Sequence, residues 1–551
     1  MTVGLSTKTS ALQRSPQQWH RRIERRLRNH RIRFEKLLAT AEKAYSQGTS
    51  HRAAVFAQMA ADFAARNHTG LFASTPLESL LSRIGLSELT PDSTLEPIRP
   101  ARLPKSVLHV MTHAKPTGGH TRLVENWVKN DSGRRHSIVV TGQGKTELPS
   151  SLQETAAPTG GSVKAVDAAP DLILQAQALR AMAVESDFVV LHVDPYDVVP
   201  LLAFAHPENL PPVVFSNHAD HLFWVGRSVS NLVIHIRESA RLHSVRRRGI
   251  EPTQATHLPI PLTPTERNKS VSEAKEALGL PVDSTLLLSM GWGYKYTPVD
   301  EFDFVAMHRE FLLRNPQVHL LVVGPRPRGV WRTAEKQTGG RLRATGGQTD
   351  LALYREAADI YVNSFPFSSL TSLLEAGLLG VPVVSFDPFH TSAPLFGSDD
   401  AGVSAELYQF EQQADYLAQL QRFVDQPAVR RVESHTLQRA IATGHTGQSW
   451  RESVESVYEH GLCMSGERCR SSLLQSADEI GLTDLLLIHL LSRAGRVPGV
   501  QGSIVGHWRR LPVTERRWIF LSALLTGRPF SGIKLLWDYA LDRLFPSRQG
   551  D

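Results

Sequence analysis

The sequence predicts an α/β protein with two consecutive doubly wound units that face one cleft, and with helical segments before and after them. Short apolar runs alternate with helical patterns over about residues 106–262, which is typical of a parallel sheet. The same alternation recurs over about 286–460. A chain of 551 residues has room for two such units and their appendages.

The segment before the first unit is predicted to be helical. Trp19, Ile23, Leu27, Phe34 and Leu38 fall near helical spacing, and arginines occupy the faces between them. Further helices are expected at about 53–66 and 77–84, and a proline-rich linker at 90–104. After residue 461, amphipathic helices are expected at 485–491, 508–518 and 533–544.

Short apolar, β-branched runs give the strands. In the first unit we expect strands at 107–111, 137–141, 188–192, 213–216 and 232–236. In the second unit we expect them at 285–290, 318–323, 342–344, 360–363 and 381–386. With a polar hinge at 263–275, the predicted domains are a helical extension (1–100), two α/β domains (101–265 and 266–460) and a second helical extension (461–551).

Composition narrows the class of protein. No run reaches the roughly 18 apolar residues of a membrane span, and the first residues lack the apolar core of a signal peptide. Cys463 and Cys469 are expected to be free thiols, so a cytoplasmic location is predicted. The net charge of +7 favours an anionic partner, such as a sugar nucleotide, acidic lipid or nucleic acid.

The segment NSFPFSSLTSLLEAGLLGVPVVSF (363–386) carries the strongest local signal. A strand is followed by a hydroxyl-rich turn and a helix from about Leu370, for which Ser368 or Ser369 suits the N-cap. Free amides and the helix dipole would favour a diphosphate there, and Glu375 lies one turn further on. A capped helix that packs on a sheet and binds nothing is the alternative.

This segment resembles the donor-site signature of a large group of GT-B glycosyltransferases, which includes sucrose-synthase-like and bacterial polysaccharide enzymes. The matching residues are Glu375, Ala376, Gly380, Pro382, Val383 and Val384, preceded by a similar run from Gly346 through Asp350, Leu351, Tyr354, Ala358 and Asp359. The resemblance implies two Rossmann-like domains. It also implies that Glu375 and the Gly346 region hold the nucleoside, while Ser369 and the amides of Leu370 and Thr371 face the diphosphate.

Two positions depart from the family pattern. Phe367 stands where the family has a glutamate near the donor sugar, and Trp292 stands where it has an arginine that grips the diphosphate. Lys295 is expected to supply a point charge to the phosphates, although a solvated loop lysine is the alternative. Arg326 and Arg328 are weaker candidates for the missing cation.

The first α/β unit supplies the rest of the expected site. Gly118 and Gly119 match the family's Gly-Gly loop beside the donor, and His120 and Arg122 could reach the cleft. His192, Asp194 and Pro195 match a strand end of the family.

His218, Asp220 and His221 are the candidate catalytic residues, as a base toward the acceptor or as partners of the donor sugar. A structural role is the alternative for each histidine. No metal and no bound cofactor are expected, because the resemblance implies that helix dipole and cations neutralise the diphosphate.

The expected function is transfer of a sugar from a nucleoside diphosphate sugar to an acceptor hydroxyl, in polysaccharide or glycoconjugate synthesis. The acceptor would be a glycan, a lipid-linked molecule or a protein. A non-catalytic sugar-nucleotide-binding or assembly protein of the same fold is the alternative, and a sugar-nucleotide epimerase is a third candidate. The basic first helix is expected to be a cap that packs on the body with its arginines solvated, and peripheral contact with an anionic membrane at its inner face is the alternative. Nucleic acid is not expected.

Overall fold

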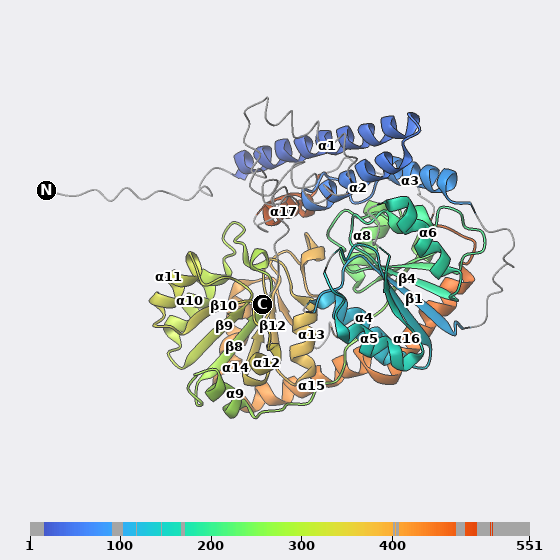
Figure 1. The fold of residues 1–551 in the computed structure, drawn as a ribbon. Coiled ribbons are helices and arrows are strands. Elements are labelled where there is room, and N and C mark those ends of the chain that lie inside the picture. The colour runs from blue at the N-terminus through green and yellow to red at the C-terminus, as the bar shows by residue number, and fades with distance from the viewer. Residues whose placement is uncertain are drawn as a thin grey trace, which may run out of the picture.

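The computed structural model describes residues 16–90, 103–116, 118–144, 146–166, 171–399, 403, 407–469, 480–492, 507 and 510. Two parallel sheets lie next to each other, each covered by helices, and an N-terminal helical layer lies across one end of the molecule (Figure 1). The predicted α/β class with two doubly wound units is therefore confirmed.

The first sheet has seven strands in the order β3-β2-β1-β4-β5-β6-β7, and all neighbouring strands are parallel. β1 and β4 lie in its centre and are buried along their whole length, which explains their continuous apolar sequences. The strands are β1 (Ser106–Met111), β2 (Arg135–Val140), β3 (Val163–Ala165), β4 (Phe188–His192), β5 (Val213–Asn217), β6 (Leu232–His235) and β7 (Ala255–His257).

The second sheet has six parallel strands in the order β10-β9-β8-β11-β12-β13. Its order also reverses beside the first strand of the unit, and such a switch point opens a crevice at the carboxyl ends of the strands. The strands are β8 (Thr285–Met290), β9 (Val318–Val323), β10 (Leu342–Gly346), β11 (Ile360–Val362), β12 (Val383–Phe386) and β13 (Tyr408–Phe410).

Helices cover both sheets because parallel strands are apolar on both faces. The helices associated with the first sheet are α4 (Gly119–Asn130), α5 (Ser150–Ala156), α6 (Leu172–Ala183), α7 (Val199–Ala203) and α8 (Glu238–Arg248). Those associated with the second are α9 (Val271–Ala277), α10 (Phe304–Arg314), α11 (Val330–Gln337), α12 (Leu351–Ala357), α13 (Leu370–Leu378), α14 (Gln413–Asp425) and α15 (Pro427–His445).

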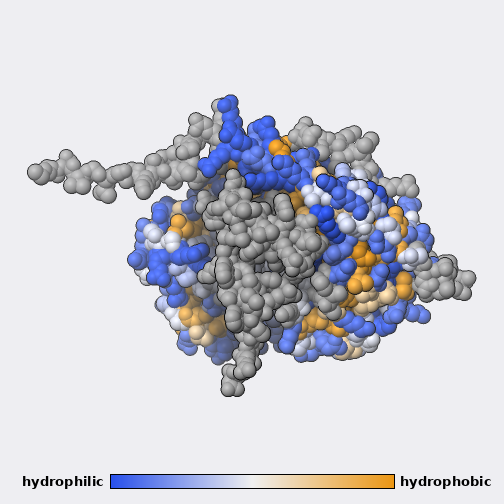
Figure 2. All heavy atoms as spheres, turned by 45° about the horizontal axis from the view of Figure 1, so that its top comes forward, coloured by the Kyte–Doolittle hydropathy of each residue, from blue (hydrophilic) through white to orange (hydrophobic). Residues whose placement is uncertain are grey.

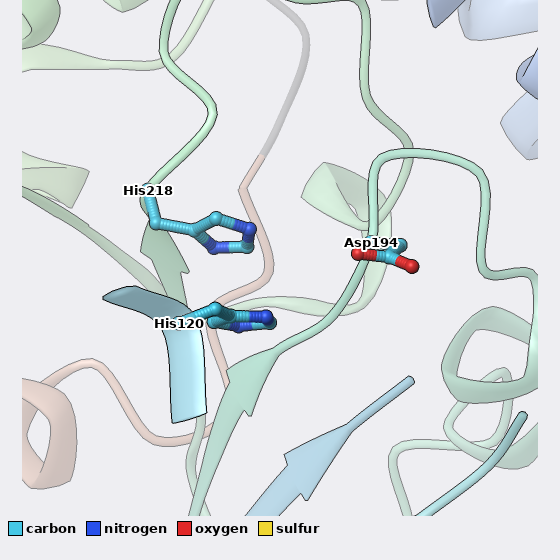
Figure 3. Close-up of side chains that lie close together, drawn as sticks. All are labelled: His120, Asp194 and His218. Carbon is cyan, nitrogen blue, oxygen red and sulfur yellow. The ribbon is translucent and has the colours of Figure 1, made fainter. Parts of the chain in front are cut away.

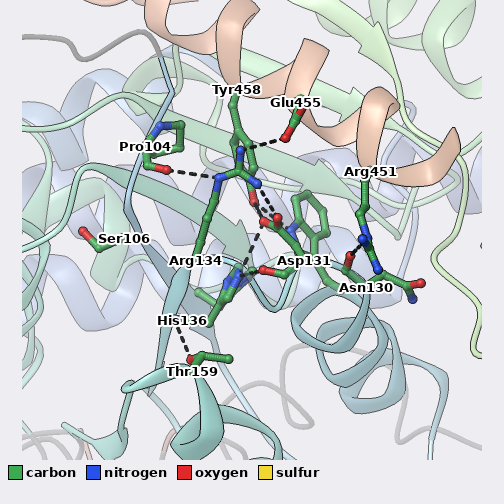
Figure 4. Close-up of polar contacts among 12 residues, drawn as sticks. Pro104, Ser106, Asn130, Asp131, Arg134, His136, Thr159, Arg451, Glu455 and Tyr458 are labelled. Atoms are coloured by element: carbon green, nitrogen blue, oxygen red, sulfur yellow. Dashed lines mark hydrogen bonds and ion pairs between the residues drawn. The ribbon is translucent and has the colours of Figure 1, made fainter. Parts of the chain in front are cut away.

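Helix α16 (Gly447–Cys463) follows the second unit in sequence but packs on the first. Tyr458 receives a hydrogen bond from Trp127 Nε1 at 3.0 Å and donates to Asp131 Oδ2 at 2.7 Å (Figure 4). Arg134 pairs with Asp131 and also contacts Glu455 of α16 at 3.2 Å. Helix α16 therefore returns from the second unit to the first.

An N-terminal layer is formed by α1 (Pro16–Ser46), α2 (Ser50–Arg66) and α3 (Thr75–Glu88). Helix α17 (Leu482–Leu491), from the other end of the chain, packs against it through Leu485 and Ile488. Asp484 of α17 is buried and contacts His68 at 2.7 Å and Arg247 at 3.1 Å. The two ends of the described chain therefore share one core.

Several elements differ from the expectation. The short strands β3, β7 and β13 were not predicted, and the predicted polar hinge at 263–275 contains the start of α9. The helices expected at 508–518 and 533–544 lie outside the described residues. None of the described helices has the length and hydropathy to cross a membrane.

The docking of α16 gives a stability prediction. A Cβ added at Gly461 would lie 2.7 Å from Phe188 Cζ and 3.2 Å from Val214 Cγ2, so Gly461→Ala should lower stability by about 1–3 kcal/mol. Gly444 in α15 has nothing within 4 Å of its added Cβ, so Gly444→Ala should leave stability unchanged or slightly higher. Scanning calorimetry should show a lower Tm for the first variant only, and equal Tm values would contradict this packing.

Candidate active site between the two sheets

The loops at the carboxyl ends of the two sheets approach each other. Arg122, in the first turn of α4, contacts Glu375 of α13 at 2.6 Å, so the two units touch across the cleft. The ring of His221, after β5, meets the ring of Phe367, after β11, at 4.7 Å between centroids. A ligand bound at this junction would contact both units.

The side chain of Asn363 holds the backbone at the N-terminus of α13 through hydrogen bonds. The amide oxygen of Asn363 accepts from the Ser369 N–H at 3.1 Å, and its Nδ2 donates to Ser368 Oγ at 2.8 Å. Ser369 is the N-cap residue, as expected, but its hydroxyl bonds Ser364 instead of capping the helix. The N–H groups of Leu370 and Thr371 have no acceptor among the described residues, which leaves the start of the helix able to bind an anion.

Lys295 lies beside this helix start. Its Nζ donates to the carbonyl oxygen of Ser368 at 2.7 Å and lies over the ring of Phe367, 4.8 Å from its centroid. Burial, and next the positive charge of Arg237, lower the pKa of Lys295 to about 7. Lys295 is therefore a partly buried amine that is bonded to the start of α13, and the solvated-loop alternative does not fit its position.

Glu375 is the carboxylate of this wall. Its two oxygens accept from Arg122 at 2.6 Å and from Arg355 at 2.7 Å, and its side chain is 15% exposed. Three charged side chains from α4, α12 and α13 therefore meet at one point. Both arginines hold Glu375 in a fixed position at the edge of the cleft.

Glycines keep the walls of the cleft open. A Cβ at Gly291 would lie 2.4 Å from Ser369 Oγ, so only glycine allows the loop after β8 to approach the start of α13. Gly118 has φ +147 and, like its neighbour Gly119 and like Gly346 at the end of β10, has nothing within 4 Å of an added Cβ. These three predicted residues lie at loop positions with free space around them.

The three predicted catalytic residues do not lie in one group: Asp220 and His221 lie together, and His218 lies apart from them. Asp220 is buried and bonds Arg237 Nε at 2.7 Å, and the other Arg237 nitrogens donate to the carbonyl oxygens of Gly397 and Leu395. Burial opposes the charge of Asp220, but Arg237 outweighs it and holds the pKa of Asp220 well below its usual range. His221 bonds Asp220 at 3.2 Å and packs edge-on against Phe367. This pair therefore lies at a domain junction.

His218 lies in a different group, with His120 of α4 and Asp194 after β4 (Figure 3). The His120 and His218 rings stack with centroids 4.1 Å apart and 23° between planes. Burial lowers the pKa values of both, that of His120 to about 3, so both imidazoles are neutral at pH 7. The three side chains have ligand atoms within 4.8 Å of one another, but stacked rings do not converge on one ion.

His113 also belongs to this group, although no motif in the sequence had pointed to it. Its Nδ1 contacts Asp194 Oδ2 at 2.7 Å, and its side chain is 36% exposed. The two residues are 81 positions apart, on the loops that follow the adjacent strands β1 and β4. Strand adjacency brings them together, and only the sheet order could have revealed it.

The residues that depart from the family pattern have contrasting positions. Phe367 is buried and packs on Phe396 at 5.3 Å between ring centroids. Trp292 is 74% exposed, in the loop after β8. Arg326 and Arg328 are also exposed, on the neighbouring loop after β9, so they lie at the outer rim of the site.

This protein is similar to known proteins in its three-dimensional structure but not in its sequence. No protein-family model matches the chain, and no curated protein matches its sequence. A crystal structure of a glycosyltransferase from Rickettsia africae ESF-5 is 10% identical, with a TM-score of 0.50 over 65% of this chain and 99% of that chain. TarM is 11% identical, with a TM-score of 0.50 over 64% of this chain and 98% of that chain.

Structural similarity at 10–11% sequence identity shows a shared fold and no more. It confirms the fold that the sequence motifs predicted for the two α/β units, and the helical layers at both ends lie outside most of the matched length. The protein therefore has the GT-B fold and resembles glycosyltransferases of that fold.

Proposed function

We propose that the protein transfers a sugar from a nucleoside diphosphate sugar to an acceptor hydroxyl. The observation that carries this proposal is the start of α13, where the amides of Leu370 and Thr371, which have no acceptor in the part of the chain that the structure describes, lie next to the partly buried amine of Lys295. A diphosphate bound there would receive hydrogen bonds and positive charge from one rigid element. Arg122 of α4 contacts Glu375 of α13, and the proposed acceptor would bind on this side of the first unit.

The site must stabilise the charge of the leaving diphosphate. As the bond between sugar and phosphate breaks, negative charge gathers on the diphosphate, and fixed amides with a neighbouring ammonium stabilise it. Ser369 and Gly291 shape the cradle, and Gly118 and Gly119 leave room for the donor on the opposite wall. Glu375 and the backbone near Gly346 are the proposed contacts of the nucleoside. A resident metal has no role in this scheme.

The alternative is a protein of the same fold that binds a sugar nucleotide without turning it over. Phe367 favours this alternative, because an apolar ring occupies the position of the family's acidic residue. Release of free sugar from a nucleotide sugar would exclude it, since a non-catalytic binder leaves the glycosidic bond intact. The acceptor proposed here is a glycan, a lipid-linked molecule or a protein, within polysaccharide or glycoconjugate synthesis.

Binding of a diphosphate tests the donor site. At 100 times its Kd, one of UDP, GDP, TDP or ADP should stabilise the wild type by about 2.7 kcal/mol. Glu375→Ala should abolish the stabilisation, because the nucleoside loses its carboxylate and two arginines lose their partner. Glu276→Ala, at an exposed position of α9, is the matched control and should respond like the wild type. If none of the four diphosphates shifts the Tm of the wild type, the proposal is wrong.

Lys295 gives the site a pH dependence. Its pKa of about 7 in the free protein means that the amine is charged below pH 7 and mostly neutral above it. A bound diphosphate favours the charged amine, so binding above pH 7 requires uptake of a proton. The Kd should rise by up to roughly tenfold per pH unit between pH 7 and 9. Titration calorimetry should show this rise in the wild type and in Lys336→Met, an exposed control, whereas Lys295→Met should bind weakly at every pH.

We further propose that α1 contacts an anionic membrane. Its apolar face packs inward through Ile23, Leu27, Phe34 and Leu37, while its outer face is basic and carries Arg21, Arg22, Arg25, Arg28, Arg33 and Lys36, all exposed. Ile32, in the same face, is 50% exposed. Figure 2 shows hydrophilic residues gathered along the edge where α1 lies. Cationic side chains around an apolar residue fit acidic lipid headgroups.

Vesicle sedimentation tests this contact. The triple variant Arg21→Glu, Arg25→Glu, Arg28→Glu should weaken binding to phosphatidylglycerol vesicles by more than about 100-fold, at about 1 kcal/mol for each basic residue lost. Arg314→Glu, Arg332→Glu, Arg439→Glu makes the same change of charge at exposed sites of the second unit and should retain binding. Equal loss in both triples would mean that net charge, not α1, governs the interaction.

A further inference from the structure

Arg122 contacts the second unit with only part of its guanidinium. Its Nη1 donates to Glu375 Oε1 at 2.6 Å, and its side chain is 36% exposed. Its Nε and Nη2 make no hydrogen bond to the part of the chain that the structure describes. A guanidinium carries five N–H donors in one plane, so Arg122 keeps donors for a ligand while it stays paired with Glu375.

The charges around Glu375 do not balance. Arg355 of α12 donates to the other oxygen of Glu375 at 2.7 Å, so one carboxylate is shared by two guanidiniums. Within the described ranges of the chain, no second carboxylate lies at ion-pair distance from Arg122 or Arg355. One positive charge is therefore left over beside α13, and a ligand that brings negative charge would compensate it.

This positive charge lies close to the start of α13. Side chains on a helix lean toward its N-terminus, so the carboxylate of Glu375 lies alongside the first turn of α13. Burial and, to a smaller extent, the negative charge of Glu375 raise the pKa of the Tyr361 hydroxyl, so this hydroxyl lies near Glu375. The same hydroxyl donates to the carbonyl oxygen of Met290 at 3.3 Å, and Met290 precedes Gly291, which packs against the N-cap residue of α13.

The other cations nearby are less able to supply a permanent charge to a ligand. Lys295 has a pKa of about 7, so its amine is only partly charged at neutral pH. All three nitrogens of Arg237 already donate to Asp220 or to carbonyl oxygens. Arg355 is 14% exposed. Arg122 is both fixed by an ion pair and open to solvent.

We propose that Arg122 binds the diphosphate of the donor from the first unit, opposite Lys295 and the start of α13; this inference rests on the proposed function. The N–H groups of Nε and Nη2 donate to phosphate oxygens while Nη1 stays on Glu375, which fixes the plane of the guanidinium. As negative charge gathers on the leaving diphosphate, the guanidinium stabilises it, and its charge does not change with pH as that of Lys295 does. The diphosphate is thus held by both units.

The test compares two ligands on the full-length protein: the diphosphate that stabilises the wild type, and the uncharged nucleoside of the same base. Titration calorimetry and saturation-transfer NMR at pH 6, where Lys295 is charged, give the two Kd values. Arg122→Gln should raise the Kd of the diphosphate by about 10- to 100-fold, as expected for loss of a charged hydrogen bond. It should leave the Kd of the nucleoside unchanged, which also shows that the variant folds.

Two further variants sharpen this comparison. Arg122→Lys should recover part of the lost affinity, because the ammonium keeps the charge but lacks the planar fork of donors. Lys129→Gln is the matched control, because it removes the same charge from an exposed position about two turns further along α4. It should bind both ligands like the wild type.

The outcomes separate this inference from the donor site itself. If Arg122→Gln binds the diphosphate as the wild type does, or more tightly, the inference is overturned and the donor site stands. Equal weakening for diphosphate and nucleoside also overturns it, because Arg122 would then act only by positioning Glu375. If no diphosphate binds the wild type, the proposed function fails and this inference fails with it.

Discussion

One buried cation, the guanidinium of Arg237, joins the two units at their junction. It bonds Asp220 of the first unit and two carbonyl oxygens of the loop at 395–397 in the second. Removing one partner of such a buried pair costs about 3–5 kcal/mol, because the remaining charge is left without compensation. Phe367 and His221 pack next to this junction, and Lys295 lies close enough for the charge of Arg237 to lower its pKa. The two units are thus joined by the same guanidinium whose charge lowers the pKa of Lys295.

Most of the fold could be predicted from the sequence because buried parallel strands have continuous apolar sequences. The strands that were missed, β3, β7 and β13, are three residues long and mostly half-buried or exposed, so their polar side chains do not distinguish them from loops. The turn and helix that follow β11 could also be predicted, because the residues from Asn363 to Glu375 form one continuous segment. The His113–Asp194 pair could not, because it depends on which strands lie side by side.

The sequence also placed His218, Asp220 and His221 in one group because they are close in number. In the structure, β5 ends just before them, so successive side chains point to different surroundings. His218 turns toward α4, whereas Asp220 turns toward Arg237. Proximity along a loop is weak evidence for a shared site.

Phe367 changes the electrostatics of the donor wall. A carboxylate at this position would neutralise Lys295, whereas the aromatic ring offers only its face, 4.8 Å from Nζ. The amine is left with a carbonyl oxygen as its hydrogen-bond partner, and burial works against its charge. A site of this kind gains most from a ligand that brings its own negative charge, so the departure from the family pattern is compatible with binding of a diphosphate.

The core that α17 shares with the N-terminal layer also includes residues of the second unit. Leu486, Leu487 and Leu490 of α17 belong to one apolar cluster with Phe72 of the N-terminal layer and with Val299 and Phe367 of the second unit. His489 also reaches the Pro298 carbonyl oxygen at 2.9 Å. The appended helices are therefore not detachable modules: a protein trimmed to its two sheets would lose apolar contacts that support Val299 and Phe367, next to the start of α13.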